Sequence, residues 1–253
     1  MGAHYGLAGL ACGPHYQTAR PGQFITMRLA HESAPLLRRP FSIHRLIQEN
    51  GSVSGIEVLY KIVGSFTDRL SRVPMNAAVD LLGPLGRGFS MDPARKKILL
   101  IAGGIGVAPL MFLADRLADR GADMSASAVC IGGRSAGDIL CKTDFMLHGM
   151  NVLIATEDGG MGEQGLVLKP AERIIRAARP DIIYACGPMP MLKAVIALAQ
   201  LHGIPCEVSI ETMMACGLAA CLGCAVKTSD SGDGYRHVCK DGPVFDARHL
   251  MLS

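Results

Sequence analysis

The sequence lacks tryptophan, and only 5% of its 253 residues are aromatic. This composition argues against a surface on which nucleic-acid bases stack. The 25 basic and 22 acidic residues leave a net charge of +3, which is too small for a nucleic-acid-binding face. No apolar run reaches the roughly 18–20 residues of a membrane span, and the N-terminus lacks the basic flank of a signal peptide. These absences predict a soluble, cytoplasmic protein without a nucleic-acid or membrane partner.

The chain has enough apolar residues to bury a substantial core. Hydrophobic residues make up 49% of it and charged residues 19%, which excludes a disordered or collagen-like chain. At about 150 residues per domain, 253 residues correspond to about one and a half to two domains.

The first third of the chain has the pattern of short β-strands. Strands are expected at 23–30, 41–46, 53–62 and 78–82, with turn residues such as Asn50-Gly51 and Gly83-Pro84 between them. Strands at this spacing predict a small antiparallel β-barrel.

From Lys96 onward, strands alternate with helices. Strands are expected at 98–102, 126–131, 152–156, 181–186 and 206–210, and helices at 109–120, 171–178 and 189–202. This alternation predicts a parallel α/β sheet with helices on both faces. We therefore expect a β + α/β fold with a barrel domain at 1–92, an α/β domain at 93–210 and a cysteine- and glycine-rich segment at 211–253.

The nine cysteines are the most informative residues. An odd number in a chain of cytosolic character favours metal or redox chemistry over a disulfide framework. Five are scattered, whereas the remaining four have the spacing Cys216-x4-Cys221-x2-Cys224-x14-Cys239. This is the spacing of plant-type [2Fe–2S] ligands, and the small residues between Cys216 and Cys224 suit a loop that turns tightly around a cluster.

Two alternatives to an iron–sulfur centre remain open for these cysteines. The spacing could arise by chance, or the cysteines could hold a structural zinc ion. Zinc sites usually show two close cysteine pairs, and here only Cys221 and Cys224 form such a pair. The spacing therefore favours an iron–sulfur centre over either alternative.

A glycine-rich turn follows the first strand of the α/β region. Gly103, Gly104 and Gly106 lie between that strand and a helix, where a pyrophosphate can approach the backbone and the helix N-terminus. The turn departs from the full dinucleotide motif because Pro109 stands at the position of its third glycine. A purely structural role for these glycines stays open.

A second candidate lies where a later strand ends. Cys186 and Gly187 are expected at the carboxyl edge of the sheet, which is where open α/β sheets bind ligands. Cys186 is a candidate to lie beside a nicotinamide ring. The alternative is a buried thiol at the end of a strand.

The barrel region contains candidate phosphate-binding and ring-binding residues. Arg39 can bind phosphate through two hydrogen bonds, and Ser42 adds a hydroxyl. Tyr60 and Lys61 supply an aromatic face and a cation, and the turn from Gly64 to Thr67 suits phosphate. The alternative for each of these residues is a solvated charge or an ordinary turn.

Three motifs, taken in chain order, resemble those of the ferredoxin–NADP reductase superfamily: Arg39-Pro40-Phe41-Ser42, the turn from Gly103 to Pro109, and Cys186-Gly187-Pro188. Within that superfamily, Met214-Ala215-Cys216-Gly217 and Cys239-Lys240-Asp241-Gly242-Pro243 are similar to the electron-transfer subunits of heteromeric, NAD-dependent dihydroorotate dehydrogenases. The resemblance extends from Arg20 to nearly the end of the chain. It implies FAD in the barrel, NAD(H) on the α/β domain and a [2Fe–2S] cluster in the C-terminal segment.

The resemblance also implies a set of site residues. Cys186 would lie at the nicotinamide, and the cluster ligands would be Cys216, Cys221, Cys224 and Cys239. The remaining cofactor-binding residues would be Arg39, Pro40, Phe41, Ser42, Leu59, Tyr60, Lys61, Phe66, Thr67, Gly103, Gly104, Gly106 and Gly187.

The function implied is electron transfer in pyrimidine biosynthesis. Electrons would pass between NAD(H), FAD, the cluster and the FMN of a catalytic dihydroorotate dehydrogenase subunit, in a heterotetramer with two copies of each chain. An NAD(P)H–ferredoxin, sulfide or glutamate-synthase-type reductase subunit is an alternative with the same cofactors. A non-enzymatic, zinc-stabilised binding module is an alternative from another class.

Three positions depart from the family pattern. Ala219 stands where a glycine is usual in the cluster loop, and Phe66 replaces the glycine before Thr67. The N-terminus looks short, so the first barrel strand is expected to be missing or replaced by Gly2–Gly13.

Overall fold

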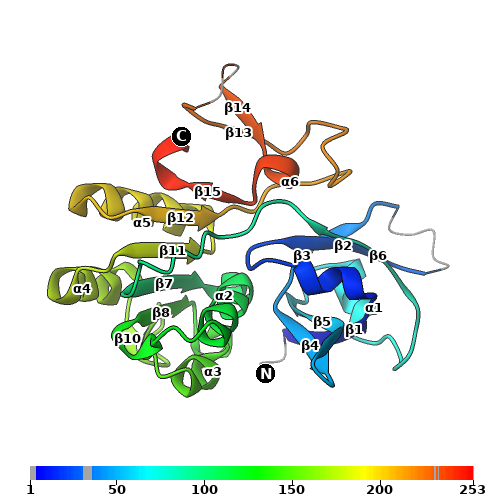
Figure 1. Ribbon diagram of the computed structural model, residues 1–253, viewed down its shortest axis with the longest axis horizontal. Coiled ribbons are helices and arrows are strands. Elements are labelled where there is room, and N and C mark those ends of the chain that lie inside the picture. The colour runs from blue at the N-terminus through cyan, green and yellow to red at the C-terminus, as the bar shows by residue number, and fades with distance from the viewer. Residues whose placement is uncertain (1–3, 31–35, 231, 233, 253) are drawn as a thin grey trace.

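The computed structural model describes residues 4–30, 36–230, 232 and 234–252. Figure 1 shows a barrel of short strands beside an α/β sheet, with the C-terminal segment above the junction between them. The β + α/β fold expected from the sequence is confirmed. No helix in the described part of the chain has the length and apolar character that a membrane span requires.

The barrel consists of two three-stranded antiparallel sheets with the orders β1-β5-β4 and β3-β2-β6. Its strands are β1 (Tyr5–Ala11), β2 (Phe24–Leu29), β3 (Arg39–Ser42), β4 (Arg45–Glu49), β5 (Ser52–Lys61) and β6 (Val79–Leu85), and its helices are η1 (Pro14–Thr18) and α1 (Ser65–Leu70). Fully buried side chains of both sheets, such as Ile25, Met27 and Ile56, form the barrel core.

Two expectations for the barrel are wrong. The first barrel strand is present, because β1 pairs with β5 along its whole length, from Tyr5 opposite Lys61 to Ala11 opposite Gly55. Its glycines have no side chains and so obscured the alternating pattern of a strand. At Gly6 a Cβ would overlap the ring of Tyr60. The single strand expected at 41–46 is instead divided between β3 and β4.

The α/β part is a seven-stranded sheet with the order β10-β9-β8-β7-β11-β12-β15. Its strands are β7 (Ile98–Gly103), β8 (Ala128–Gly133), β9 (Asn151–Thr156), β10 (Glu163–Gln164), β11 (Ile182–Cys186), β12 (Cys206–Ser209) and β15 (Val244–Asp246). The helices are α2 (Val107–Asp119), α3 (Lys142–Leu147), α4 (Leu168–Ala178) and α5 (Met189–His202), with single 3₁₀ turns η2 (Gly104–Gly106), η3 (Met124–Ala126) and η4 (Ala136–Asp138). All neighbouring strands run parallel except β15, which is antiparallel to β12.

The central strand β7 shows why its apolar run is continuous. Leu99 and Ile101 pack in the cluster that contains α4 and α5, whereas Leu100 and Ala102 pack in the cluster that contains α2 and α3. Alternate residues of a strand point to opposite faces, so a strand covered on both faces must be apolar throughout.

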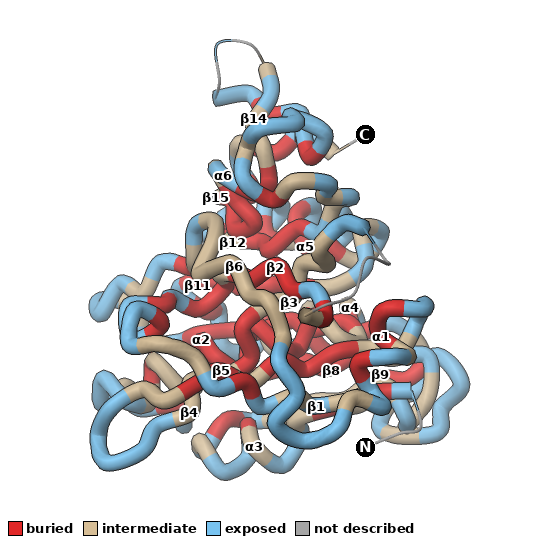
Figure 2. Tube along the Cα trace, turned by 90° about the vertical axis from the view of Figure 1, so that its right-hand side faces the viewer, coloured by how far each residue is buried: buried red, intermediate tan, exposed pale blue. Residues whose placement is uncertain are grey.

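The C-terminal segment is joined to the α/β sheet. It contains β13 (Ala225–Lys227), β14 (Tyr235–His237), α6 (Val238–Asp241), β15 and η5 (Ala247–His249). β13 and β14 form a hairpin, and Figure 2 shows β14 at one end of the molecule, beyond the buried residues of β12 and β15. The sequence predicted neither this hairpin nor β15, because three-residue strands are too short for a periodic pattern.

Candidate functional site

A cavity of about 540 Å³ lies where all three parts of the chain meet. Its barrel side is lined by Phe24, Arg39, Pro40, Phe41, Ser42, Leu59, Tyr60, Lys61, Val63, Gly64, Ser65, Phe66 and Thr67. Its other walls are Ile105 and Ala108, next to β7, and Ser209, Ile210, Glu211, Thr212, Met214 and Pro243. The structure therefore brings together all nine barrel residues that the sequence suggested for the flavin.

Aromatic rings form part of the cavity wall. The ring of Phe41 lies 5.8 Å from that of Phe66 and 6.3 Å from that of Tyr60, centroid to centroid. β3 supplies Phe41, β5 supplies Tyr60 and α1 supplies Phe66. A wall of this kind suits the flat, largely apolar ring system of a flavin.

Thr67 has a structural role in this wall. Its hydroxyl accepts hydrogen bonds from the backbone N–H groups of Val63 (3.0 Å) and Gly64 (3.1 Å). The side chain thus fixes the turn that leads from β5 into α1.

Two cations border the cavity. The Arg39 guanidinium donates a hydrogen bond to the carbonyl of Leu37 (2.9 Å), and the Lys61 ammonium lies 3.3 Å from the carboxylate of Asp138. An arginine and a lysine at the border of an apolar cavity suit a ligand with a ring system and a phosphate group.

Sequence reasoning missed the part of the wall that follows β12. The Thr212 hydroxyl oxygen is buried and has no hydrogen-bond partner among the described residues, so it is available to a polar atom of a ligand. Glu211 faces the cavity, and the surrounding protein raises the pKa of its carboxyl by desolvation. The signal in the sequence was position, since both residues follow a strand at the carboxyl edge of the sheet.

The glycines at the carboxyl edge pack two turns against each other. A Cβ on Gly106 would overlap the carbonyl of Cys186, and one on Gly103 would lie 2.7 Å from the sulfur of Met191. Gly187 is equally crowded, because its Cβ would lie 3.0 Å from the backbone of Gly103. Gly104 differs: it has a φ of +52°, and its Cβ would meet only the Tyr5 hydroxyl, at 4.0 Å. Gly104 is therefore the glycine of this turn with open space beside it.

Cys186 lies beneath these turns. Its side chain is 1% exposed, and burial raises the pKa of its thiol. The thiol is therefore neutral, and Cys186 is not among the residues that line the cavity. Its role at the nicotinamide remains a prediction.

The four clustered cysteines lie around the loop that follows the cavity wall. The Cys216 sulfur accepts hydrogen bonds from the backbone N–H groups of Leu218 (3.3 Å) and Cys221 (3.4 Å), which lower the pKa of its thiol to about 6. Thiolates are the form that binds iron, and N–H donors on the sulfurs stabilise them.

The other three thiols differ in burial. The sulfurs of Cys224 and Cys239 are buried and lie 3.3 Å apart, and Cys239 also accepts a hydrogen bond from the N–H of Ala219 (3.1 Å). Cys221 is exposed. In the described part of the chain, no three His, Cys, Asp or Glu side chains lie close enough together to hold a metal ion. A donor set of four thiols with N–H groups on the sulfurs fits an iron–sulfur cluster.

The loop departs from the usual backbone at Ala219. This residue has a φ of +61°, in the left-handed region that favours glycine. The conformation explains why a glycine is usual here in the family that the sequence resembles.

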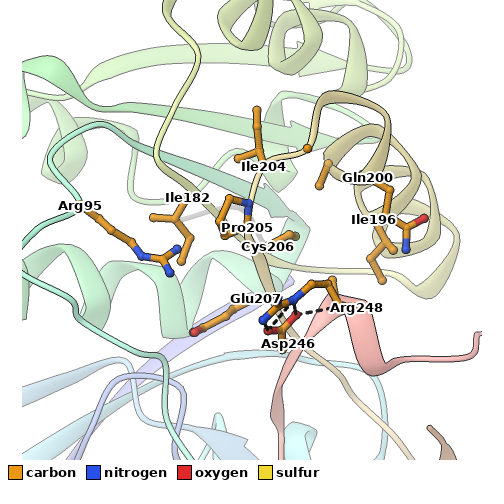
Figure 3. Close-up of a pocket in the computed structure, with 13 residues that line it drawn as sticks. Arg95, Ile182, Ile196, Gln200, Ile204, Pro205, Cys206, Glu207, Asp246 and Arg248 are labelled. Carbon is orange, nitrogen blue, oxygen red and sulfur yellow. Dashed lines mark hydrogen bonds and ion pairs between the residues drawn. The ribbon is translucent and has the colours of Figure 1, made fainter. Parts of the chain in front are cut away.

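A second cavity, of about 450 Å³, lies at the opposite edge of the sheet, where β11 and β12 begin (Figure 3). Figure 3 shows Ile182, Cys206 and Arg95 around it, together with the ion pair of Asp246 and Arg248, whose charged atoms lie 2.6 Å apart. None of the site residues expected from the sequence lines this cavity.

Comparisons with known proteins identify a family for the chain. Residues 211–251 match the model of the iron–sulfur cluster binding domain of dihydroorotate dehydrogenase B, and residues 100–196 match the oxidoreductase NAD-binding domain. The chain is 39% identical to a dihydroorotate dehydrogenase B (NAD(+)) electron transfer subunit of Desulforamulus reducens, over 92% of this chain and 87% of that protein. It is 37% identical to the same subunit of Geobacillus thermodenitrificans, over 93% of this chain and 88% of that protein.

Solved structures share the fold. An NADH-dependent reduced ferredoxin–NADP oxidoreductase superposes with a TM-score of 0.80 and 25% identity, over 100% of this chain and 90% of that chain. The cytochrome b5 reductase domain of Ulva prolifera nitrate reductase superposes with a TM-score of 0.64 and 16% identity, over 81% of this chain and 89% of that chain.

Proposed function

Because the chain belongs to the family of electron-transfer subunits of NAD-dependent dihydroorotate dehydrogenase B, we propose a cofactor for each of its parts. The central cavity takes FAD, the turns at the carboxyl edge of the sheet take NAD(H), and the four clustered cysteines hold a [2Fe–2S] cluster. We keep 1–92, 93–210 and 211–253 as the three functional units, although β15 extends the sheet of the second.

One observation carries this proposal: all three units contribute to the wall of a single cavity. The strand β12 ends at Ser209, and the chain then passes along the cavity through Glu211, Thr212 and Met214. Cys216, the first cluster cysteine, follows two residues after Met214. A ligand in the cavity would therefore be in contact with the segment that leads to the cluster.

When bound, a flavin exchanges a hydride with NAD(H) and single electrons with an iron–sulfur cluster. The protein has three tasks in this chemistry. Arg39 and the backbone of the α1 turn bind phosphate, Phe41 and Tyr60 orient the ring system, and the apolar wall excludes water. Ser42 and Tyr60 are the residues we expect to tune the flavin, and the loop N–H groups stabilise the thiolate ligands of the cluster.

An electron-transfer subunit serves a catalytic partner, and no group in this proposal oxidises dihydroorotate. We propose that the partner carries FMN and that two copies of each chain form a heterotetramer in pyrimidine biosynthesis. The loop around Cys221 offers an apolar surface, since Met213, Leu218 and Leu222 are 91%, 53% and 57% exposed. Methionine and other apolar residues are enriched in the cores of protein interfaces. Met214, in the cavity wall, is the half-buried end of the same segment.

A cytoplasmic location is part of the proposal. None of the nine cysteines forms a disulfide, as suits a reducing compartment.

Family membership also bears on the two alternative functions, a zinc-stabilised module and another kind of reductase subunit. A zinc-stabilised module would bind no flavin. It would give no reason why all nine residues suggested for the flavin line one cavity. A ferredoxin, sulfide or glutamate-synthase-type reductase subunit would use the same cofactors and differ only in the partner.

The purified protein tests the assignment of cofactors. We expect a yellow-brown protein with one FAD and two irons per chain, and anaerobic NADH should bleach the flavin before it reduces the cluster. A colourless protein that contains zinc would contradict the proposal.

A further inference from the structure

Asp138 connects the barrel to the carboxyl edge of the α/β sheet. It follows β8 and receives hydrogen bonds at Oδ1 from the Tyr5 hydroxyl (2.5 Å) and the Lys61 ammonium (3.3 Å), both of which belong to the barrel. Its other oxygen, Oδ2, accepts a hydrogen bond from the backbone N–H of Arg134 (3.1 Å), within its own turn. One carboxylate therefore holds two barrel side chains and one turn of the α/β domain.

The two barrel residues lie side by side. Tyr5 of β1 is directly opposite Lys61 of β5, and the ammonium nitrogen of Lys61 lies 5.1 Å from the centre of the Tyr5 ring. Tyr5 is buried, and the Asp138 side chain is 15% exposed. Although partial burial raises the pKa of the Asp138 carboxyl, hydrogen bonds from Tyr5 and Lys61 hold it below its ordinary value. Asp138 is therefore ionised, and its contacts are charge-assisted.

Lys61, Tyr5 and the turn that contains Arg134 and Asp138 each lie at a different part of the site where NAD(H) and the flavin must meet. Lys61 lines the central cavity. The Tyr5 hydroxyl is the nearest group to the open side of Gly104. Arg134 belongs to the turn after β8, and its carbonyl in turn accepts a hydrogen bond from Asp158 N–H after β9 (3.1 Å).

We infer that Asp138, held by Tyr5 and Lys61, is a positioning residue that fixes the nicotinamide-binding turns relative to the flavin cavity. The inference rests on the proposed function, because it concerns how bound NAD(H) reaches the flavin. Hydride transfer depends steeply on geometry, and a displacement of about 1 Å can slow a reaction about a hundredfold. Loosening this contact should therefore slow flavin reduction by bound NADH more than it weakens NADH binding.

A second contact between the same domains provides a matched control. Arg45 of β4 forms ion pairs with Asp115 of α2 (2.9 Å) and Asp144 of α3 (2.8 Å). Neither partner belongs to the turns at the carboxyl edge. Asp144→Asn therefore weakens domain docking without touching Asp138 or the nicotinamide-binding turns.

The test is stopped-flow reduction of the flavin-loaded protein by NADH. We expect Asp138→Ala to lower the limiting rate about ten- to hundredfold and Tyr5→Phe to lower it less. Asp138→Asn should restore only part of the rate, because its amide oxygen still accepts from Tyr5 and Lys61 but its NH2 group cannot accept from Arg134 N–H. The Kd of NADH should stay within about twofold throughout, and Asp144→Asn should match the wild type.

Hydrogen exchange gives a readout that does not depend on activity. Without NADH, amides in the turn from Gly133 to Asp138 should exchange faster in Asp138→Ala than in the wild type, because Arg134 N–H loses its acceptor. Asp144→Asn should leave that turn unchanged.

The outcomes separate this inference from the proposed function. Wild-type limiting rates in both Asp138→Ala and Tyr5→Phe would overturn the inference alone, and so would an equal loss of rate in Asp144→Asn. Failure of NADH to reduce the wild-type flavin would instead contradict the proposed function. In that case unchanged exchange in Asp138→Ala would still overturn the role given to Asp138.

Discussion

The cysteines of the sheet and those of the C-terminal loop have the same side chain in opposite environments. Cys130 and Cys206 lie within strands whose N–H groups pair with neighbouring strands, and burial raises the pKa of each thiol to about 12. Cys216 lies in a loop, where N–H groups without ladder partners point at its sulfur and lower its pKa to about 6. In a sheet, the backbone N–H groups are already hydrogen-bonded to neighbouring strands. In an irregular loop they are free to donate hydrogen bonds to a thiolate and stabilise it.

The comparison explains why the sheet and the C-terminal loop have different roles. The sheet supplies rigid turns at its carboxyl edge, and close packing of Gly103, Gly106 and Gly187 holds these turns together. The loop supplies ligands, and its backbone is strained at Ala219 to do so. Substitutions in the two regions should therefore fail in different ways.

The largest effect is expected when a ligand is removed from the loop. Cys239→Ser should lose nearly all iron, because serine is a poor ligand for this cluster and the buried sulfur of Cys239 has no substitute. Cys206→Ser is the matched control in the sheet: it should be destabilised by about 1–3 kcal/mol and keep its iron. Iron content per chain and visible absorbance measure both variants. If Cys239→Ser keeps the full iron content of the wild type, Cys239 is not a ligand of the cluster.

A substitution in the turns of the sheet should act on folding. In Gly106→Val the new side chain overlaps the Cys186 carbonyl, so we expect a loss of more than about 3 kcal/mol of stability. The sequence alone predicts a different result: the side chain would intrude on the path of the pyrophosphate and block flavin reduction by NADH, while the cluster stays intact. Thermal unfolding distinguishes the two: a wild-type melting temperature with no flavin reduction by NADH would favour the prediction from sequence.

Arg39 should affect the flavin without affecting the cluster. Arg39→Ala should weaken FAD binding about ten- to hundredfold, which corresponds to the roughly 1.5–3 kcal/mol of a charged hydrogen bond. Arg38→Ala is the control, because Arg38 pairs with Asp80 (2.6 Å) and does not line the cavity. Titration of the flavin-free protein with FAD measures both affinities, and equal affinities would contradict a phosphate contact at Arg39.

The smallest effect concerns Ala219, a strained position in the loop. Ala219→Gly should relieve roughly 1 kcal/mol of strain at a φ of +61° and slow the release of iron to a chelator a few-fold. Ala220→Gly, next to it, has no positive φ to relieve and should not slow release. Faster release from Ala219→Gly than from the wild type would show that the loop gains nothing from glycine.

The longer elements of the fold could be predicted from the sequence, and the shortest could not. Helix α5 and strand β7 have clear patterns and were expected within a residue of their observed bounds. Strand β1 was missed because its glycines carry no side chain to show alternation, although Gly6 allows the ring of Tyr60 to pack closely. β15 was missed because its pairing with β12 is a tertiary contact without a local signal.

The same distinction applies to the site. Motifs indicated the barrel side of the cavity and the four cysteines, because each motif is local in sequence. Tyr5 and Asp138 are separated by 133 positions and meet only in the folded protein. The unpaired hydroxyl of Thr212 likewise became visible only when its surroundings were known.

The central claim is that electrons leave the flavin cavity through the loop cysteines. The most direct test mixes Cys224→Ser protein with the catalytic dihydroorotate dehydrogenase subunit and follows NADH oxidation with orotate as the acceptor. We predict that orotate-linked turnover falls to background, while reduction of an artificial two-electron acceptor by NADH stays near the wild-type rate, because the flavin cavity does not include Cys224. Orotate-linked turnover at the wild-type rate would show that the cluster is not on the path of the electrons.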